Sequence, residues 1–361
     1  MPLSENYSKI VTSQVHSSQV WWCTFNCRTR LILNNTIRVT SGIIFPCRTF
    51  RLTAGPVTLV DSELAVGVIF LSQTVVGILG NSYILHHYLL FHFRGCRLRS
   101  TDWILMHLTI ANILSLSCKG VPQILAAFGW KDFLNDFGCK GLFYLHRVGK
   151  GVSIGSTSFL SVFQAITISP RDSRWAELKG RKHKHIGSSV CLSWILYMFA
   201  SSFNLVYMRA KYSKNNTAKL KDLGYCAADN LDKISDILYI TFLSVPDFLF
   251  VGLMVWASAF MVFILHRHKQ RMQHMPRSKV SSRSSPESRA TKTVLLLVST
   301  FVFFYTLSCI FIICLVFFLN LSWLLVNVSV LVAGCFPTVS PFLLMSHFSS
   351  TSCCLLSLKK K

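Results

Sequence analysis

Long uncharged stretches divide this sequence into apolar segments separated by short polar ones. Residues 64–93 contain no Lys, Arg, Asp or Glu, and the same holds for residues 185–208 and 293–358. A membrane crossing needs roughly 20 mostly apolar helical residues. The last stretch is therefore too long for one crossing, and the polar break at Asn320 to Ser322 divides it in two. We predict seven spans, near 66–90, 103–128, 139–168, 185–208 and 238–265 and on either side of 320–322.

The spans are expected to be helices rather than barrel strands. Barrel strands alternate apolar and polar positions over about 10 residues, whereas these runs are continuous and long. Prolines occur inside several of the runs, among them Pro122, Pro246 and Pro337. Neighbouring helices in a bundle can satisfy the backbone groups that such prolines leave unpaired. The pattern predicts an all-α polytopic membrane protein.

The composition agrees with a membrane protein and argues against a soluble protein and against a nucleic-acid-binding protein. The chain is 52% hydrophobic and 14% charged, against roughly 25% charged in an average soluble domain. Its formal net charge is +23, and a strongly positive charge is also typical of nucleic-acid-binding proteins. The basic residues, however, lie between apolar runs rather than in one compact domain, so we expect no nucleic-acid partner.

The distribution of Lys and Arg predicts the orientation. The loops after spans one, three and five, with the C-terminal tail, hold 20 of these residues, and the loops after spans two, four and six hold 8. Basic loops stay in the cytoplasm, which places the N-terminus outside and the C-terminus inside. We divide the chain into an extracellular tail (1–63), a seven-span domain (64–347) and a short cytoplasmic tail (348–361). The N-terminal tail is expected to be disordered.

Cysteines and glycosylation sequons are sorted by this topology. The 13 cysteines show no metal-ligand spacing, so no metal site is predicted. Cys139 and Cys226 both fall on the outer, oxidising side, where disulfides persist. The sequence allows two alternatives, a disulfide between them or two free thiols. Asn215 in the second outer loop is a well-placed glycosylation sequon. Asn6 and Asn34 are further candidates in the tail.

Several runs resemble those of type 1 vomeronasal receptors, a family of G-protein-coupled receptors. These runs are 107–112 (HLTIAN), 119–123 (KGVPQ), 126–129 (AAFG), 134–140 (LNDFGCK), 144–149 (YLHRVG), 161–170 (SVFQAITISP), 174–179 (RWAELK), 252–258 (GLMVWAS), 266–270 (HRHKQ) and 336–342 (FPTVSPF). The resemblance covers residues 65–347. It implies a seven-helix receptor with a Cys139–Cys226 disulfide in the plasma membrane, activated by a small pheromone-like ligand and coupled to a Gi/Go-class G protein. It implies no cofactor.

The same positions depart from the larger rhodopsin-like class. Phe163-Gln164-Ala165 stands where that class has Asp-Arg-Tyr, and Asn112 stands where it has a sodium-binding Asp. Ser340-Pro341 begins the run that replaces Asn-Pro-x-x-Tyr in span seven. These departures are the vomeronasal pattern, and they remove the usual activation motifs.

Charged groups inside the spans are the candidate binding residues, because charge at membrane depth is costly. Span three carries His146 and Lys150 on one helical face, with Arg147 about 100° round. Lys119 in span two and Asp247 in span five complete the set. We expect them to bound a pocket between spans two, three and five for a ligand with an anionic or strongly accepting group. A structural network, in which Asp247 neutralises one cation, explains the same residues.

Two other functions compete with a receptor. A transporter of a small anionic solute would use the same intramembrane cations, but transporters usually show repeated halves, and we find none. An enzyme is not expected, since no GxSxG, no HExxH and no paired intramembrane carboxylates occur.

Overall fold

The computed structural model describes residues 56–95, 99–130, 133–169, 175–210, 221–222, 226–228, 233–273, 286–317 and 323–348. Within them, seven helices are long and apolar enough to cross a membrane. The crossing segments are Glu63–Phe93, Ser100–Ala127, Asp136–Ile168, Gly187–Val206, Thr241–Arg267, Ala290–Phe311 and Leu325–Met345. The predicted number of spans is confirmed. The N-terminal tail up to residue 55 and residues 349–361 lie outside the described part, as do the sequons at Asn6, Asn34 and Asn215.

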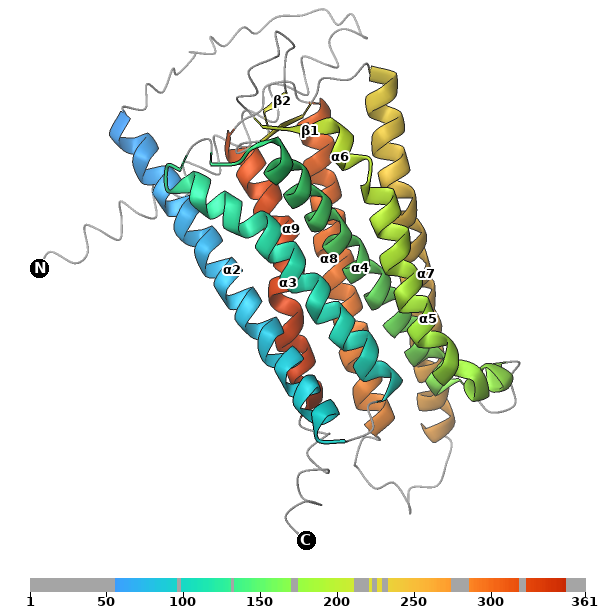
Figure 1. The fold of residues 1–361 in the computed structure, drawn as a ribbon. Helices are drawn as coiled ribbons and strands as arrows, with labels where there is room; N and C mark the ends of the chain where they lie inside the picture. Colours follow the sequence, from blue (N-terminus) through green and yellow to red (C-terminus); the bar gives the residue numbers. More distant parts are fainter. Residues whose placement is uncertain are drawn as a thin grey trace, which may run out of the picture. The chain divides into compact units, whose positions relative to one another are not determined.

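The crossing segments belong to long helices packed side by side (Figure 1). The helices are α2 (Pro56–Phe93), α3 (Ser100–Ala127), α4 (Asp136–Ile168), α5 (Trp175–Ser201), the one-turn α6 (Asn204–Tyr207), α7 (Lys233–Gln273), α8 (Pro286–Phe317) and α9 (Trp323–Phe348). Between α8 and α9 lies the predicted polar break, outside the described residues. Pro122, Pro246, Pro337 and Pro341 sit inside helices, as a packed bundle allows.

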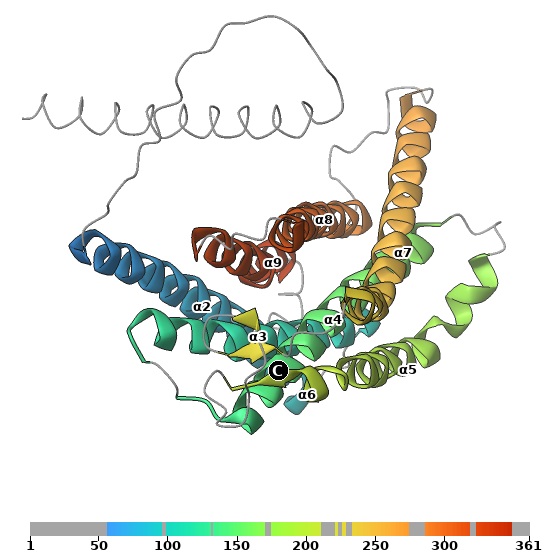
Figure 2. The ribbon, with the colours of Figure 1, turned by 90° about the horizontal axis from the view of Figure 1, so that it is seen from above.

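Helix α4 is the central element of the bundle. It packs against α3, α5 and α7 and also touches α8, while α3 packs between α2 and α4, and α9 joins α2 to α8. Figure 2 shows this arrangement along the bundle axis, with α8 and α9 side by side across from α3 and α4. Residues of α4 can therefore face almost every other span.

Small residues let α4 take this central place. A Cβ on Gly149 would lie 2.9 Å from the Ala111 carbonyl oxygen of α3, and a Cβ on Gly151 would lie 2.0 Å from Cδ1 of Tyr197 in α5. Both distances are shorter than real Cβ contacts allow. The glycines thus permit the close backbone approach that membrane helices use in place of a hydrophobic driving force.

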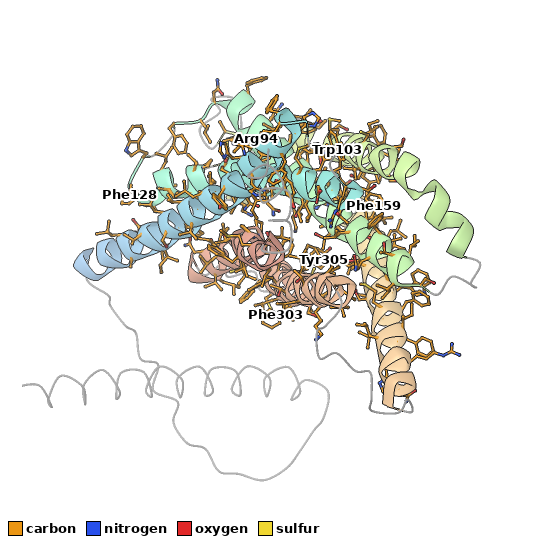
Figure 3. The ribbon with its side chains drawn as sticks, turned by 90° about the horizontal axis from the view of Figure 1, so that it is seen from below. Arg94, Trp103, Phe128, Phe159, Phe303 and Tyr305 are labelled. Carbon is orange, nitrogen blue, oxygen red and sulfur yellow. A yellow bond between two sulfur atoms is a disulfide. The ribbon has the colours of Figure 1, made fainter. Side chains whose placement is uncertain are left out.

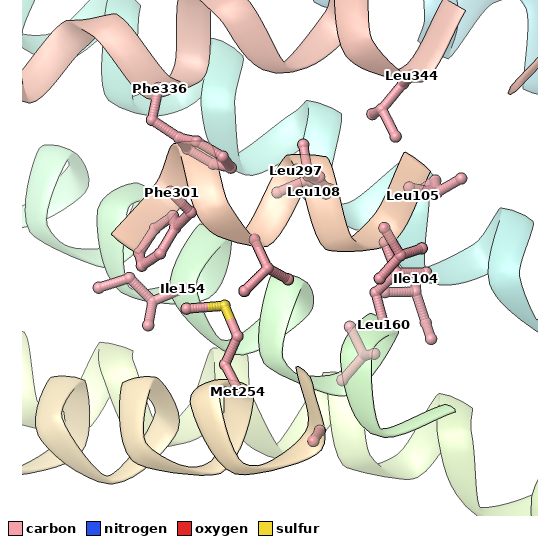
Figure 4. Close-up of a cluster of buried hydrophobic side chains, with 14 of the residues drawn as sticks. Ile104, Leu105, Leu108, Ile154, Leu160, Met254, Leu297, Phe301, Phe336 and Leu344 are labelled. Atoms are coloured by element: carbon pink, nitrogen blue, oxygen red, sulfur yellow. The ribbon is translucent and has the colours of Figure 1, made fainter. Parts of the chain in front are cut away.

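A hydrophobic core fills one end of the bundle (Figure 4). It draws on the second halves of α2, α4, α7 and α9, on the first halves of α3 and α8 and on the middle of α5. Its members include Ile104, Leu108, Leu160, Met254, Leu297, Phe301 and Leu344. The outer surface of the bundle is apolar as well, with Leu79, Phe199, Leu249 and Phe303 all more than 60% exposed. Large exposed apolar side chains on every side are what a lipid environment requires.

Three short strands lie at the opposite end of the bundle (Figure 1). Strands β1 (Met208–Arg209), β2 (Lys221–Asp222) and β3 (Ala227–Ala228) form a small antiparallel sheet in the order β1-β3-β2. Cys226, beside β3, is bonded to Cys139 in the first turn of α4. The carboxylate of Asp136 also accepts a hydrogen bond from the Ala210 backbone N–H at 2.6 Å. The segment of β1, β2 and β3 is therefore fixed to the start of α4 by a covalent bond and a hydrogen bond.

Candidate functional site

A neutral polar hub holds four helices together in the middle of the bundle. The Asn112 amide of α3 donates to Asn81 Oδ1 of α2 at 3.2 Å and to Ser340 Oγ of α9 at 2.9 Å, and its carbonyl oxygen accepts from Ser153 of α4 at 2.7 Å. Asn81 donates in turn to the Pro337 carbonyl oxygen at 2.8 Å. All these side chains are buried. Both amide hydrogens of Asn112 are used, so it acts as a helix connector.

An ion pair joins α4 to α7. Arg147 Nη1 lies 2.8 Å from Asp247 Oδ2, and Arg147 also donates to the Leu243 carbonyl oxygen. The Tyr305 hydroxyl of α8 donates to the same Asp247 oxygen at 3.5 Å. Asp247 is only 3% exposed. Of the ionisable candidates, Arg147 and Asp247 thus adopt the structural arrangement, in which the carboxylate neutralises one cation.

Lys150 faces a different part of the bundle from Arg147. Its Nζ lies 5.5 Å from the centroid of the Tyr305 ring, a cation–π distance. Figure 3 shows Tyr305 on the side of α8 nearer the bundle interior and Phe303 on the outer side. Lys150 also lines a cavity of about 30 Å³ between α3, α4, α8 and α9, which we call the Lys150 cavity. Ser115, Ser153 and Ser308 supply hydroxyl groups to its wall.

A second cavity, of about 20 Å³, lies between α2, α3, α4 and α9 and contains Lys119; we call it the Lys119 cavity. His146 lines the same wall, and its Nδ1 lies 3.2 Å from both the hydroxyl and the carbonyl oxygen of Ser115. Gln73 of α2 completes the polar lining and donates to the Leu331 carbonyl oxygen of α9 at 2.9 Å. Ser115 and Ala333 line both cavities, so the two adjoin.

The structure brings the predicted residues together in a different grouping from the one expected. Lys119 and His146 share one cavity, Lys150 lines the other, and no described residue of α7 lines either. Span five does not bound these two cavities: α7 meets α4 through the Arg147–Asp247 pair, and the cavities lie beside α9, the Lys150 cavity also beside α8. Arg147 lies one helical step from His146, which turns its side chain toward α7.

Three contributors were not singled out from the sequence. Tyr305 touches both Lys150 and Asp247, while Ser115 and Ser308 line the Lys150 cavity. Neutral hydroxyl residues are common in membrane helices, so they give little signal. The one signal for Tyr305 was its position as a tyrosine in a charge-free span.

Comparison with known proteins agrees with this architecture. The chain matches the vomeronasal organ pheromone receptor family, type 1, over residues 64–356. It belongs to that family. It is 56% identical over 283 residues to vomeronasal type-1 receptor 4 of Homo sapiens, a match that covers 78% of this chain and 94% of the relative.

Two further relatives support membership of the same family. Vomeronasal type-1 receptor 2 of Homo sapiens is 49% identical over 282 residues, covering 78% of this chain and 71% of the relative. Olfactory receptor class A-like protein 1 of Danio rerio is 32% identical over 281 residues, covering 78% and 88%. Membership of the vomeronasal type-1 family makes this a receptor-family protein of the multi-pass membrane class and not an enzyme. The disulfide implied by the resemblance is present between Cys139 and Cys226.

Proposed function

We propose that this vomeronasal type-1 family protein is a plasma-membrane pheromone receptor whose ligand binds at the two adjoining cavities and carries an anionic or strongly accepting group. The observation that carries the proposal is that each cavity holds one lysine, and that neither lysine has a carboxylate within 4.0 Å among the described residues. His146 and the serine hydroxyls add hydrogen-bonding groups. Arg147 and Asp247 line neither cavity; their ion pair fixes α7 against α4.

Ligand binding must change the conformation of the bundle. Cavities of about 30 and 20 Å³ hold one or two water molecules each, since a water needs some 10–15 Å³ of such space. A pheromone-sized molecule therefore binds a wider state, in which α8 or α9 has moved away from α3 and α4. Binding shifts the equilibrium toward that state, and the cytoplasmic ends of the helices then present a different surface to a Gi/Go-class G protein.

The orientation belongs to the same proposal: N-terminus outside, C-terminus in the cytoplasm. Two features support it, the 20-to-8 distribution of Lys and Arg between the two sets of loops and the disulfide at the end that would face the oxidising side. Epitope tags on both termini of intact cells test it. An antibody that reaches the C-terminal tag without permeabilisation contradicts the orientation.

Substitution of the two lysines tests the ligand site. A screen of volatile and steroid-like compounds in a calcium assay first supplies an active compound. Lys150→Met and Lys119→Met should each raise the half-maximal concentration about 10- to 100-fold, because a hydrogen bond to a charged group contributes about 1.5–3 kcal/mol. Surface expression should stay near that of the wild type.

The matched control is Lys140→Met, a lysine on the same helix α4 that lines neither cavity. It should leave the response unchanged. Full sensitivity in both cavity variants would contradict the site.

Ligand-dependent nucleotide exchange on co-reconstituted Gi or Go, compared with Gs, tests coupling. Ligand-independent flux of an anionic solute would instead favour the transporter alternative.

A further inference from the structure

The interior of the bundle carries more positive charge than its own side chains neutralise. Three cations, Lys119, Arg147 and Lys150, lie deep in α3 and α4, and among the described residues Asp247 is the carboxylate that meets them. Its ion pair is with Arg147, at 2.8 Å. Asp247 also attracts Lys150 at longer range, but one carboxylate cannot neutralise all three. In a membrane interior such an excess is costly, and it is relieved either by the loss of a proton from a lysine or by another anion.

The two lysines interact with each other across the adjoining cavities. Lys119 and Lys150 repel each other electrostatically, and each lines one of two cavities that meet at Ser115. Lys150 lies over the Tyr305 ring, and Lys119 makes no hydrogen bond or ion pair to another described residue. The arrangement places one lysine at each of two adjoining cavities, which share Ser115 and Ala333.

The space formed by the two adjoining cavities is the right size for a small anion. Its two parts have volumes of about 30 and 20 Å³, enough for one or two waters each, and a chloride ion is only slightly larger than a water molecule. Ser308, 5% exposed, also lines the Lys150 cavity, and its hydroxyl makes no hydrogen bond to another residue in the described ranges. An O–H donor and two N–H donor groups suit a halide.

We propose that the ligand-free receptor binds a halide ion, chloride under physiological conditions, in these adjoining cavities, held by Lys119 and Lys150. The ion neutralises charge that Asp247 leaves uncompensated and so stabilises the closed bundle. This inference goes beyond the proposed function, because it concerns the resting protein and needs neither a pheromone nor a G protein.

The test is the thermal unfolding of the purified full-length receptor in detergent, without ligand. Chloride, bromide and gluconate are compared at about 150 mM and equal ionic strength. Gluconate is too large for the cavities. We expect the unfolding midpoint to be about 3 °C higher in chloride and in bromide than in gluconate, the shift that a millimolar-affinity site produces.

Variants assign the effect to the cavities. In Lys119→Met and in Lys150→Met the difference between chloride and gluconate should fall to less than half of the wild-type value, whereas Lys140→Met should retain it. Equal midpoints of the wild type in the two salts would overturn the proposal. So would a double variant, Lys119→Met with Lys150→Met, that keeps the full difference.

A second measurement uses the wild type alone, in case the variants fail to fold. The ³⁵Cl NMR line should broaden in the presence of the receptor, and bromide should reverse the broadening by competition. Absence of a bromide-sensitive broadening would contradict the halide site. Neither measurement depends on pheromone response, so a failure here is distinct from a failure of the proposed receptor function.

Discussion

At the scale of single residues, charged groups that are neighbours in sequence have different roles. His146, Arg147 and Lys150 lie within five consecutive positions of α4, yet Arg147 pairs with Asp247 of α7 and the other two line cavities. The helical rotation of about 100° per residue separates them. A charge count along the sequence finds these residues, but only their neighbours on other helices distinguish an ion pair from a free cation.

The Arg147–Asp247 pair should matter for stability more than for ligand affinity. Asp247→Leu leaves a guanidinium inside the bundle without its counterion, which costs about 3–5 kcal/mol. The double variant Arg147→Met with Asp247→Leu should recover most of this loss, since neither member of the pair is then left buried without its partner. Thermal unfolding in detergent measures both. A single variant as stable as the wild type would show that the pair contributes nothing.

Asn112 should be intolerant of apolar replacement. Asn112→Leu removes the acceptor of Ser153 and the donors to Asn81 and Ser340, and each buried group left without a partner costs about 1–3 kcal/mol. We expect low surface expression and a lower unfolding midpoint. The control is Ser72→Ala: Ser72 is exposed, and its hydroxyl bonds only to the Ile69 carbonyl oxygen of its own helix. A stable Asn112→Leu protein would contradict the hub.

At the scale of helices, close approach to α4 depends on glycine. The ring of Tyr197, a fully buried residue of α5, occupies the space where a side chain on Gly151 would lie. The sequence shows that small residues are frequent in α4, which predicts close packing in general terms. It does not show which glycine faces which helix, because that depends on the rotation of α4 and on which neighbours surround it.

Two glycines of α4 provide a matched pair for testing this contact. Gly151→Ala places a Cβ 2.0 Å from Cδ1 of Tyr197, and we expect a loss of about 1–3 kcal/mol from overpacking. Gly141→Ala meets no atom within 4 Å and should be neutral or slightly stabilising, since alanine favours helix. Unfolding midpoints compare the two. Equal midpoints would contradict the α4–α5 contact.

At the scale of the whole molecule, the bundle is closed by an apolar core at one end and by a disulfide at the other. The core contains residues of seven helices, and the Cys139–Cys226 bond fixes the segment of β1, β2 and β3 to α4. The Lys150 cavity borders this core, because Ile154, Phe301 and Phe336 belong to both. Opening of the cavity therefore requires core side chains to move with their helices.

Loss of the disulfide should destabilise the receptor. Cys226→Ser frees a connection that spans 87 residues, and removal of a native disulfide typically costs about 2–5 kcal/mol. We expect reduced surface expression and a lower unfolding midpoint. Cys191→Ser, which changes an exposed free cysteine of α5, should have little effect. Treatment of the wild type with a reductant should lower its midpoint toward that of Cys226→Ser, and a reductant without effect would contradict this role.

The sequence by itself determined the seven spans, because a bilayer imposes a length and a composition on each crossing that can be counted along the chain. It also identified the charged residues, because charge is rare in apolar segments. Which of these residues meet was decided by the tertiary structure alone. Asp247 forms an ion pair with Arg147, Lys150 lies over the Tyr305 ring, and Lys119 and His146 line the same cavity. Contacts between residues far apart in sequence depend on helix rotation and on packing order, and the residue types alone do not specify either.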